Sequence, residues 1–474
     1  MEPLRVLIIG AVSGNTDEPQ PQAGIVATIF EKDESTTVRS RDWNFGVYWA
    51  QSRIEECLTP ELSALIDTVQ TDPSYRRYAE SIFPIYHNLT GEMAQALPAP
   101  YAIRLRRRAW INLLKEGLDV RYGKTIDTII PTEGGITATF KDGTVENGSL
   151  LIGAEGAHSP TRTWLFQQSP EDGALQKVPV STFATLSKLS RETALSLRKM
   201  HPTYCMSTGP NNMFTFASIH DCTPGDPGDW TFMLVLTWNY QENEDHARLA
   251  NDPVFLLEKV RALTKSLAYP HNALVRDIPP GTKTWYTSQM THWPTKPWDS
   301  RGGRVTLAGD AAHSMTFHRG QGLGNAITDV AELQTRLCAM KEHTREELAL
   351  AVDGYEKEVW KRGYHTVIEN RDNTLAVHDW NKISQSPLFL KGTAKSPTPE
   401  DGGKAGTTLF ITGRSAVSWA AELAAVTHDA ALQDAAHHQA TPQERGAAHH
   451  QATSQERGAA YHQATPQEQG AAHH

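Results

Sequence analysis

Cysteine is scarce in this sequence, with only four in a chain of 474 residues. Cys57, Cys205, Cys222 and Cys338 lie far apart, without the close pairs that ligate zinc and without the density of a disulfide scaffold. We therefore expect no metal site, reduced thiols and a cytoplasmic location.

Long hydrophobic runs and basic clusters are absent as well. No stretch approaches the ~20 apolar residues of a membrane-spanning helix, and the apolar run Leu4–Ile9 is too short for the core of a signal peptide. The net charge of −9 is spread along the chain without a basic stripe, which argues against nucleic-acid binding. We expect a soluble protein without a transmembrane segment.

The N-terminal region has the outline of a dinucleotide-binding βαβ unit. Apolar runs at residues 4–9 and 25–30 predict buried parallel strands that end at Gly10 and Glu31. A glycine there lets the backbone approach a pyrophosphate, and a carboxylate after the second strand accepts hydrogen bonds from ribose hydroxyls. Gly10 and Glu31 are therefore candidate cofactor-binding residues.

The segment between these strands departs from the usual G-x-G-x-x-G pattern. Val12 and Asn15 occupy the second and third glycine positions. Pro19 and Pro21 fall where the helix should run, and each interior proline costs roughly 3 kcal/mol in a helix. An ordinary strand–loop–strand connection is therefore an alternative for these residues.

A second motif runs from Gly309 to Gly322. A predicted strand enters an acidic turn at Asp310, and a glycine-rich stretch then opens a long helix. An aspartate accepts hydrogen bonds from a polyol, and the free N–H groups of a helix N-terminus suit an anionic ring such as a reduced flavin. A plain strand–loop–helix connection is the alternative, and for His313 a packed structural role is favoured over catalysis.

A third motif follows a hairpin predicted at residues 136–145, with Asp142-Gly143 as its turn. The buried strand predicted at residues 150–153 enters a turn of small residues, and Arg162 beyond it can pair with a phosphate or a carboxylate. The structural alternative is a strand-to-helix turn in which Ser159 is the N-cap.

The character of the sequence changes after the third motif. Alternating, β-rich runs from about 175 to 300 predict a mostly antiparallel sheet, and helical periodicity follows from residue 322, with a second helix at about 345–377. A 12-residue unit repeats from His437 and contains almost nothing apolar except alanine, so we expect disorder there. The chain thus divides into a first domain (1–175 and 301–385), a sheet domain (176–300), a linker or helical extension (386–434) and the repeat tail (435–474).

Together, these motifs resemble those of the single-component FAD-dependent aromatic hydroxylases, the para-hydroxybenzoate hydroxylase-like monooxygenases and their fungal members. Gly309–Gly322 matches the second FAD motif of this family. Gly153–Gly156 matches its Gly-Ala-Asp-Gly motif, with glutamate in place of aspartate. Arg107 matches the arginine that begins the helix facing FAD, with Arg106 or Arg108 as the alternative if the register is shifted.

The resemblance covers about residues 1–385 and implies an α/β fold. In this fold an FAD-binding, Rossmann-like domain is interleaved with a mostly antiparallel substrate-binding sheet, followed by C-terminal helices and the disordered repeat tail. Pocket residues are expected near 180–240 and near 42–52, and no catalytic base is identified. The FAD contacts that the resemblance implies are Gly10, Glu31, Arg107, Asp310, Gly322 and Leu323.

The resemblance also implies a reaction. NADPH acts as a transient reductant of FAD, which fits the lack of a second dinucleotide unit, and O2 supplies one oxygen atom to a small organic substrate. Hydroxylation or epoxidation in fungal secondary-metabolite biosynthesis is the expected activity.

Three departures from the family pattern leave alternatives open. The first glycine motif is disrupted, the proline usual after Asp310 is missing, and Asn325 lies one position later than in relatives. One alternative is another flavin oxidoreductase on the same fold, such as an oxidase, a dehydrogenase or a halogenase, although the Trp-x-Trp-x-Ile-Pro signature of tryptophan halogenases is absent. The other is a degenerate, non-catalytic paralogue, or a chain altered at residues 12–22 by an incorrect gene model.

Overall fold

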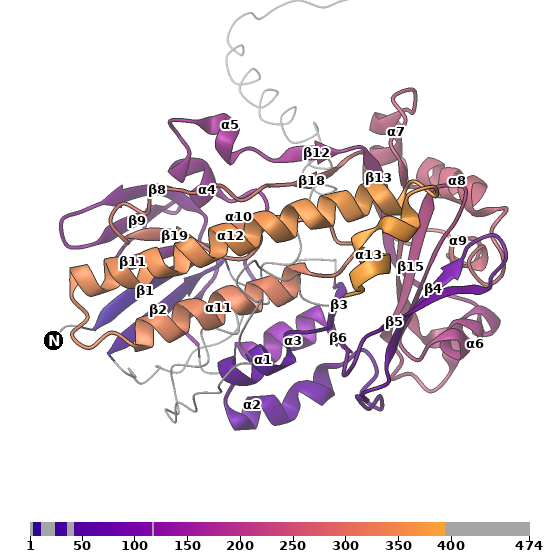
Figure 1. Cartoon of the computed structure of the whole chain (residues 1–474), viewed down its shortest axis with the longest axis horizontal. Coiled ribbons are helices and arrows are strands. Elements are labelled where there is room, and N and C mark those ends of the chain that lie inside the picture. Colours follow the sequence, from indigo (N-terminus) through magenta and orange to yellow (C-terminus); the bar gives the residue numbers. More distant parts are fainter. Residues whose placement is uncertain (1–2, 11–23, 36–41, 116–117, 394–474) are drawn as a thin grey trace, which may run out of the picture.

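The computed structural model describes residues 3–10, 24–35, 42–115 and 118–393. The disrupted helix expected after Gly10 and the repeat tail lie outside the described residues. Within them, a parallel sheet and a mostly antiparallel sheet lie at opposite ends of the molecule (Figure 1). The interleaved α/β organisation expected from the sequence is confirmed.

The parallel sheet carries the two strands expected at the N-terminus. Ile9 pairs with both Phe30 and Gly153, and Gly153 also pairs with Leu307, so four neighbouring strands end at the same edge. Parallel sheets bind ligands at this carboxyl edge. The order of its five strands is β19 (Val305–Leu307), β11 (Leu150–Gly153), β1 (Leu4–Ile9), β2 (Ile25–Phe30) and β7 (Val120–Arg121).

The predicted hairpin is confirmed and belongs to a small antiparallel sheet beside the first. Gly143 has φ +84°, and Asp142 Oδ1 accepts a hydrogen bond from the N–H of Thr144 at 3.0 Å, which closes the turn. The order of the three strands is β10 (Val145–Gly148), β9 (Ile136–Phe140) and β8 (Ile126–Pro131).

A seven-stranded sheet forms the other end of the molecule. Each pair of neighbouring strands within it is antiparallel, except for the parallel pair β14 and β4. The sequence placed this sheet within residues 176–300, but β4 and β5 add two strands from residues 82–98 of the first segment. The strand order is β17 (Thr284–Thr287), β13 (Val180–Lys188), β16 (Thr231–Asn239), β15 (Met213–Asp221), β14 (Tyr204–Thr208), β4 (Ile82–His87) and β5 (Met93–Pro98).

The two faces of this sheet have different partners, because successive side chains of a strand point to opposite sides. In β16, Phe232, Leu234 and Leu236 pack into one apolar cluster, whereas Met233 and Val235 belong to another. The first cluster includes helices behind the sheet, and the second faces the interior of the molecule. The helices of the first cluster are α6 (Arg191–Met200), α7 (His246–Asn251), α8 (Pro253–Thr264) and α9 (Ala273–Arg276).

Two long helices pack against each other, and one of them connects the two sheets. Helix α11 (Gly322–Cys338) packs against α12 (Arg345–Val377), whose bounds agree with the predicted helix at 345–377. The 33 residues of α12 span about 50 Å, and the helix runs from the parallel sheet to the seven-stranded sheet (Figure 1). None of the described helices combines the length and apolar content needed to cross a membrane.

Shorter elements complete the described chain. The remaining strands pair as β3 (Asn44–Val47) with β6 (Ile103–Arg106) and β12 (Gln176–Val178) with β18 (Met290–His292). The remaining α-helices are α1 (Gln51–Cys57), α2 (Pro60–Leu65), α3 (Arg107–Leu114), α4 (Pro160–Leu165), α5 (Pro170–Gly173), α10 (Asp310–His313) and α13 (Pro387–Lys391), and short 3₁₀ helices lie at Ile66–Val69, Pro227–Asp229 and Ile383–Gln385.

Candidate active site

Gly10 and Glu31 lie at the carboxyl edge of the parallel sheet, directly after β1 and β2. Gly10 has φ +98°, and a Cβ there would lie 2.7 Å from the carbonyl oxygen of Ala154. Only glycine fits this close approach of two turns. Glu31 is buried, and its Oε1 accepts a hydrogen bond from the N–H of Asp33 at 2.9 Å.

Asp310 lies at the same edge, as the first residue of α10 after β19. It is buried, and Gly309 before it has φ +60°. Arg162 donates from Nη1 to the carbonyl oxygens of Ala311 at 3.0 Å and Asp310 at 3.4 Å, and its guanidinium lies 4.8 Å from the ring centre of Trp293. Arg162 therefore holds the turn that presents Asp310.

Burial lowers the pKa of Arg162 to about 10, although the negative charges of Glu155 and Asp310 oppose the shift. Arg162 thus stays charged at neutral pH. Ser159 Oγ accepts from the N–H of Arg162 at 3.0 Å and caps α4, which is the structural arrangement considered from the sequence.

His313 belongs to a buried ionic network. Its Nε2 lies 2.7 Å from Asp329 Oδ2, which also accepts from the N–H of Gly309 at 2.6 Å. Arg362 Nη2 donates to the other oxygen of Asp329 at 2.5 Å. Burial raises the pKa of Asp329, but the charges of His313 and Arg362 outweigh it and hold the pKa below its usual range. These contacts agree with the packing role expected for His313.

The N-terminus of α11 carries Gly322 and Leu323, both fully buried. The side chain of the N-cap residue, Gln321, does not bond to the N–H groups of the helix. Its Oε1 instead accepts a hydrogen bond from Trp49 Nε1 at 2.8 Å. The first N–H groups of a helix have no partner within it, so those of α11 are available to a ligand. The indole of Trp49 packs directly over Gly324, where an added Cβ would lie 2.6 Å from the ring.

A cavity of about 870 Å³, including its open mouth, lies between the loop before α11 and the seven-stranded sheet. β3, β6 and the loop before α11 form one side, and β4, β15 and β16 form the other. Among the described residues, those that line the cavity include three arginines and a histidine but no acid. Its aromatic lining consists of Trp43, Phe45, Tyr48, Phe83, Phe214, Phe216 and Phe317.

Arg107 lines this cavity and begins α3. It is buried, and its backbone N–H donates to the carbonyl of Trp43 at 2.9 Å. The two neighbours considered from the sequence do not line the cavity. Arg106 Nη1 reaches Asp221 at 3.4 Å, and the backbone of Arg108 donates to Asp42 at 2.8 Å.

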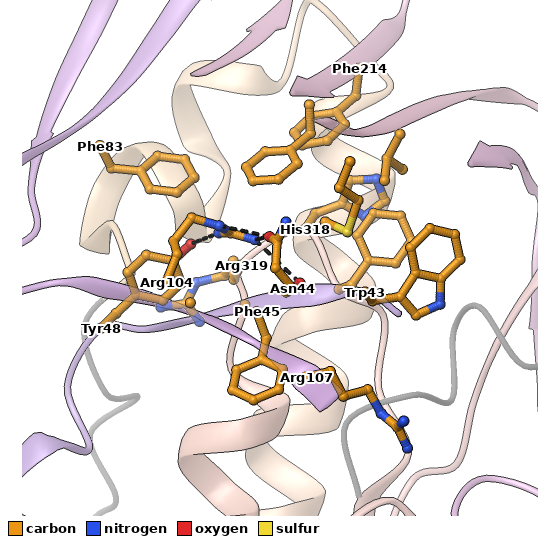
Figure 2. Close-up of a pocket in the computed structure, with 16 residues that line it drawn as sticks. Trp43, Asn44, Phe45, Tyr48, Phe83, Arg104, Arg107, Phe214, His318 and Arg319 are labelled. Carbon is orange, nitrogen blue, oxygen red and sulfur yellow. Dashed lines mark hydrogen bonds between the residues drawn. The ribbon is translucent and has the colours of Figure 1, made fainter. Parts of the chain in front are cut away.

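Arg104 is a cavity residue that the sequence analysis did not identify. It is 4% exposed and donates to Asn44 Oδ1 from Nε at 2.9 Å and from Nη2 at 2.5 Å. Its Nη1 donates to Tyr48 Oη at 3.1 Å (Figure 2). The run of arginines at residues 104–108, paired with the stretch expected near the pocket at 42–52, was the signal that could have indicated it.

His318, in the loop before α11, is tied to the sheet and to α12. Its Nε2 lies 3.1 Å from Thr237 Oγ1 and its Nδ1 lies 2.8 Å from Thr374 Oγ1, while Thr237 also contacts His378 Nε2 at 2.8 Å. Burial and the neighbouring His378 lower the pKa of His318 well below its usual value. His318 is therefore neutral and contributes shape and hydrogen bonding rather than charge.

Comparisons with known proteins show the family to which the chain is similar. Residues 110–367 match the FAD binding domain family. The FAD-dependent monooxygenase cctM of Talaromyces islandicus is 40% identical over 390 residues, which cover 82% of this chain and 96% of that protein. The FAD-dependent monooxygenase phnB of Penicillium herquei is 31% identical over 394 residues, which cover 82% and 94%.

A solved structure shares the fold at low sequence identity. HpxO of Klebsiella pneumoniae, complexed with FAD and uric acid, superposes with a TM-score of 0.61 at 16% identity, covering 82% of this chain and 92% of that one. Since the family model matches more than half of the chain and the fungal relatives match most of it, the chain belongs to the FAD-dependent monooxygenases, with FAD as its cofactor.

Proposed function

We propose that this flavoenzyme uses NADPH as a transient reductant and O2 as co-substrate to hydroxylate or epoxidise a small organic molecule in fungal secondary-metabolite biosynthesis. The observation that carries the proposal is the position of the cavity. It joins Arg107 and the loop before α11, at the cofactor end, to the apolar inner face of the seven-stranded sheet. A partly open cavity of this kind can hold a flavin ring beside a flat substrate and limit the access of water.

The described residues fit FAD, and we assign its contacts along the carboxyl edge of the sheet. Gly10 and Glu31 hold the ADP half, because a buried carboxylate after β2 can accept hydrogen bonds from ribose hydroxyls. Asp310 accepts from the sugar-alcohol chain. The uncapped N–H groups of Gly322 and Leu323 orient the flavin ring, with Arg107 beside it.

FAD, when bound, supplies the redox chemistry that activates O2. The chain positions the reactants. We propose that residues 1–175 and 301–385 form the FAD-binding domain and that the seven-stranded sheet, which is built mainly from residues 176–300, forms the substrate side. The four free cysteines support a reducing, cytoplasmic location.

Flavin binding tests this proposal first. The purified chain, incubated with FAD and desalted, should retain a yellow flavin spectrum that bleaches when NADPH is added without oxygen. A dissociation constant for FAD in the low micromolar range or tighter would exclude the degenerate-paralogue alternative. A chain that stays colourless after incubation with FAD would contradict the proposed function.

A further inference from the structure

The last described residues of the chain, 386–393, lead from α12 to the loop before α11, and we call them the C-terminal strap. Most of the C-terminal strap is α13, which lies beside the C-terminal part of α12 (Figure 1). Ser386 Oγ caps this helix by accepting from the N–H of Phe389 at 3.3 Å, and Gly392 ends it with φ +62°. The cap and the glycine give the C-terminal strap a defined start and end.

The C-terminal strap is anchored in the interior of the molecule. Leu388 is fully buried in the apolar cluster on the inner face of the seven-stranded sheet. Its N–H donates to Asn373 Oδ1 of α12 at 2.8 Å. Lys391 Nζ donates to Glu369 Oε1 of the same helix. One apolar contact and two polar contacts therefore fix the position of the C-terminal strap against α12.

Two consecutive carbonyl groups of the C-terminal strap accept hydrogen bonds from the loop before α11. Arg319 Nε donates to the carbonyl of Gly392 at 3.2 Å, and Gln321 Nε2 donates to that of Thr393 at 2.9 Å. Arg319 Nη1 also donates to Glu369 Oε2 at 2.7 Å, so one carboxylate holds both the loop and the C-terminal strap. Because Arg319, Gln321 and Thr393 are buried, water does not compete for these bonds.

The amide of Gln321 is held at both of its ends. An amide nitrogen carries two hydrogens, and Nε2 reaches the carbonyl oxygen of Arg319 at 3.4 Å as well as that of Thr393. Oε1 accepts from Trp49 Nε1, and the ring of Trp49 packs over Gly324 in the first turn of α11. The amide is therefore kept away from the first N–H groups of α11, which stay open to a ligand.

We propose that the C-terminal strap positions the flavin end of the FAD site, with Arg319 and Gln321 as the positioning residues that connect it to Gly322 and Leu323. This inference rests on the proposed function, which places the flavin ring at the N-terminus of α11. It extends the cofactor site beyond residue 385, where the sequence resemblance ends. Negative charge develops on the ring when it is reduced, and helix N–H groups stabilise that charge only when they are held in place.

Gln321→Leu in the full-length chain tests the C-terminal strap, because leucine is of similar size and lacks the amide. The dissociation constant for FAD, measured by flavin fluorescence, should rise about 5- to 50-fold, the range of a coupling between two sites. In protein saturated with FAD, the visible circular dichroism of the flavin should change. The reduction potential of the flavin should fall, since the N–H groups that stabilise negative charge are displaced. A role in folding alone would lower the melting temperature and leave both flavin properties unchanged.

Glu369→Gln keeps the test decisive if Gln321→Leu fails to fold. This change removes the charge that holds Arg319 and the C-terminal strap, yet Glu369 does not line the cavity. The dissociation constant for FAD should rise about 2- to 10-fold, the effect of weakening one contact, and the flavin spectrum should differ from that of the wild type. Asp372→Asn is the matched control, because Asp372 forms a surface ion pair in the same helix, and it should match the wild type in both measurements.

Hydrogen exchange of the unmodified chain gives an independent measurement. Coupling is reciprocal, so FAD must stabilise the C-terminal strap if the C-terminal strap stabilises bound FAD. The N–H groups of Leu390 and Gly392, which are bonded within the C-terminal strap, should exchange at least about 5-fold more slowly when FAD is bound. Helix α6, behind the seven-stranded sheet, is the internal control and should exchange at the same rate in both states.

Two results would overturn the C-terminal strap as a positioning element. One is that every folded variant, saturated with FAD, keeps the flavin spectrum and the reduction potential of the wild type. The other is that FAD leaves the exchange of the C-terminal strap unchanged. A folded variant that takes up no FAD, beside a wild-type chain that does, supports the inference. A wild-type chain that takes up no FAD contradicts the proposed function, whereas the two results above, obtained with FAD bound, contradict only the C-terminal strap.

Discussion

The backbone conformation at Gly10 requires glycine, whether or not a ligand is bound. Its φ of +98° and the contact of 2.7 Å that a Cβ would make with Ala154 predict that Gly10→Ala lowers the free energy of unfolding by about 2–4 kcal/mol. Gly143 is the matched control, because its φ is +84° and no atom lies within 4 Å of an added Cβ. Gly143→Ala should cost about 1 kcal/mol.

Urea denaturation of the two variants measures this difference. Equal losses for Gly10→Ala and Gly143→Ala would show that the turn after β11 does not restrict Gly10.

Asp310 tests the cofactor assignment at the level of one carboxylate. Asp310→Ala removes a charged acceptor, which contributes about 1.5–3 kcal/mol, so the dissociation constant for FAD should rise about 10- to 100-fold. Quenching of flavin fluorescence measures it. Asp353→Ala, on the exposed side of α12, should bind FAD like the wild type. An unchanged constant for Asp310→Ala would contradict the assignment.

At the scale of elements, the network around Asp329 joins the turn of the second motif to both long helices. It connects Gly309 and His313 with α11 through Asp329 and with α12 through Arg362. The orientation of Asp310 and of the N-terminus of α11 therefore depends on one buried carboxylate.

Removing that charge should destabilise the chain strongly. Asp329→Asn leaves Arg362 with one fewer counter-ion in a buried site, and breaking a buried pair costs about 3–5 kcal/mol. Asp353→Asn breaks an exposed pair with Lys357 in the same helix and should cost at most about 0.5 kcal/mol. Chemical denaturation compares the two, and similar losses would contradict the importance of the network.

Elements specified by local sequence were predictable. The periodicity at 345–377, the Asp142-Gly143 turn and the apolar strands β1 and β2 all agree with the structure. The position of β4 and β5 was not predicted, because pairing of β4 with β14, more than 100 residues away in sequence, depends on tertiary contacts that no local pattern carries.

The site was predictable to a similar extent. Motif positions led to Gly10, Glu31 and Asp310, which follow strands of the parallel sheet, to Arg107, which lines the cavity, and to Gly322 and Leu323, which begin α11. Their role as FAD contacts stays a prediction. Arg104 was missed, because a strand arginine becomes distinctive only when its surroundings show that it lacks an acid, whereas Tyr48 lies in the stretch expected near the pocket at 42–52. That information depends on packing between β3, β6 and β15.

At the scale of the whole molecule, buried histidines predict an acid-sensitive fold. Burial lowers the folded-state pKa to about 4 for four histidines, His201, His271, His292 and His378. Below the unfolded value of about 6.5, the unfolded chain binds protons that the folded chain does not. Stability should therefore fall as the pH drops from about 6.5 towards 4, by up to about 1.4 kcal/mol per pH unit for each histidine.

Thermal unfolding between pH 7 and pH 5 checks this expectation. The melting temperature should decrease over that range, and His271→Gln, which removes one of these groups, should show a shallower decrease. A melting temperature that does not change with pH would contradict the neutral state of the buried histidines.

The whole molecule joins a cofactor edge and an aromatic cavity, and oxygen transfer is the activity that this arrangement predicts. The most direct test is mass spectrometry of the product formed by FAD-loaded protein with NADPH, phenolic candidate substrates and isotopically labelled O2. The proposed function predicts a product that has gained one labelled oxygen atom. NADPH oxidation that depends on the substrate but adds no labelled oxygen to it would contradict monooxygenation and favour an oxidase or dehydrogenase.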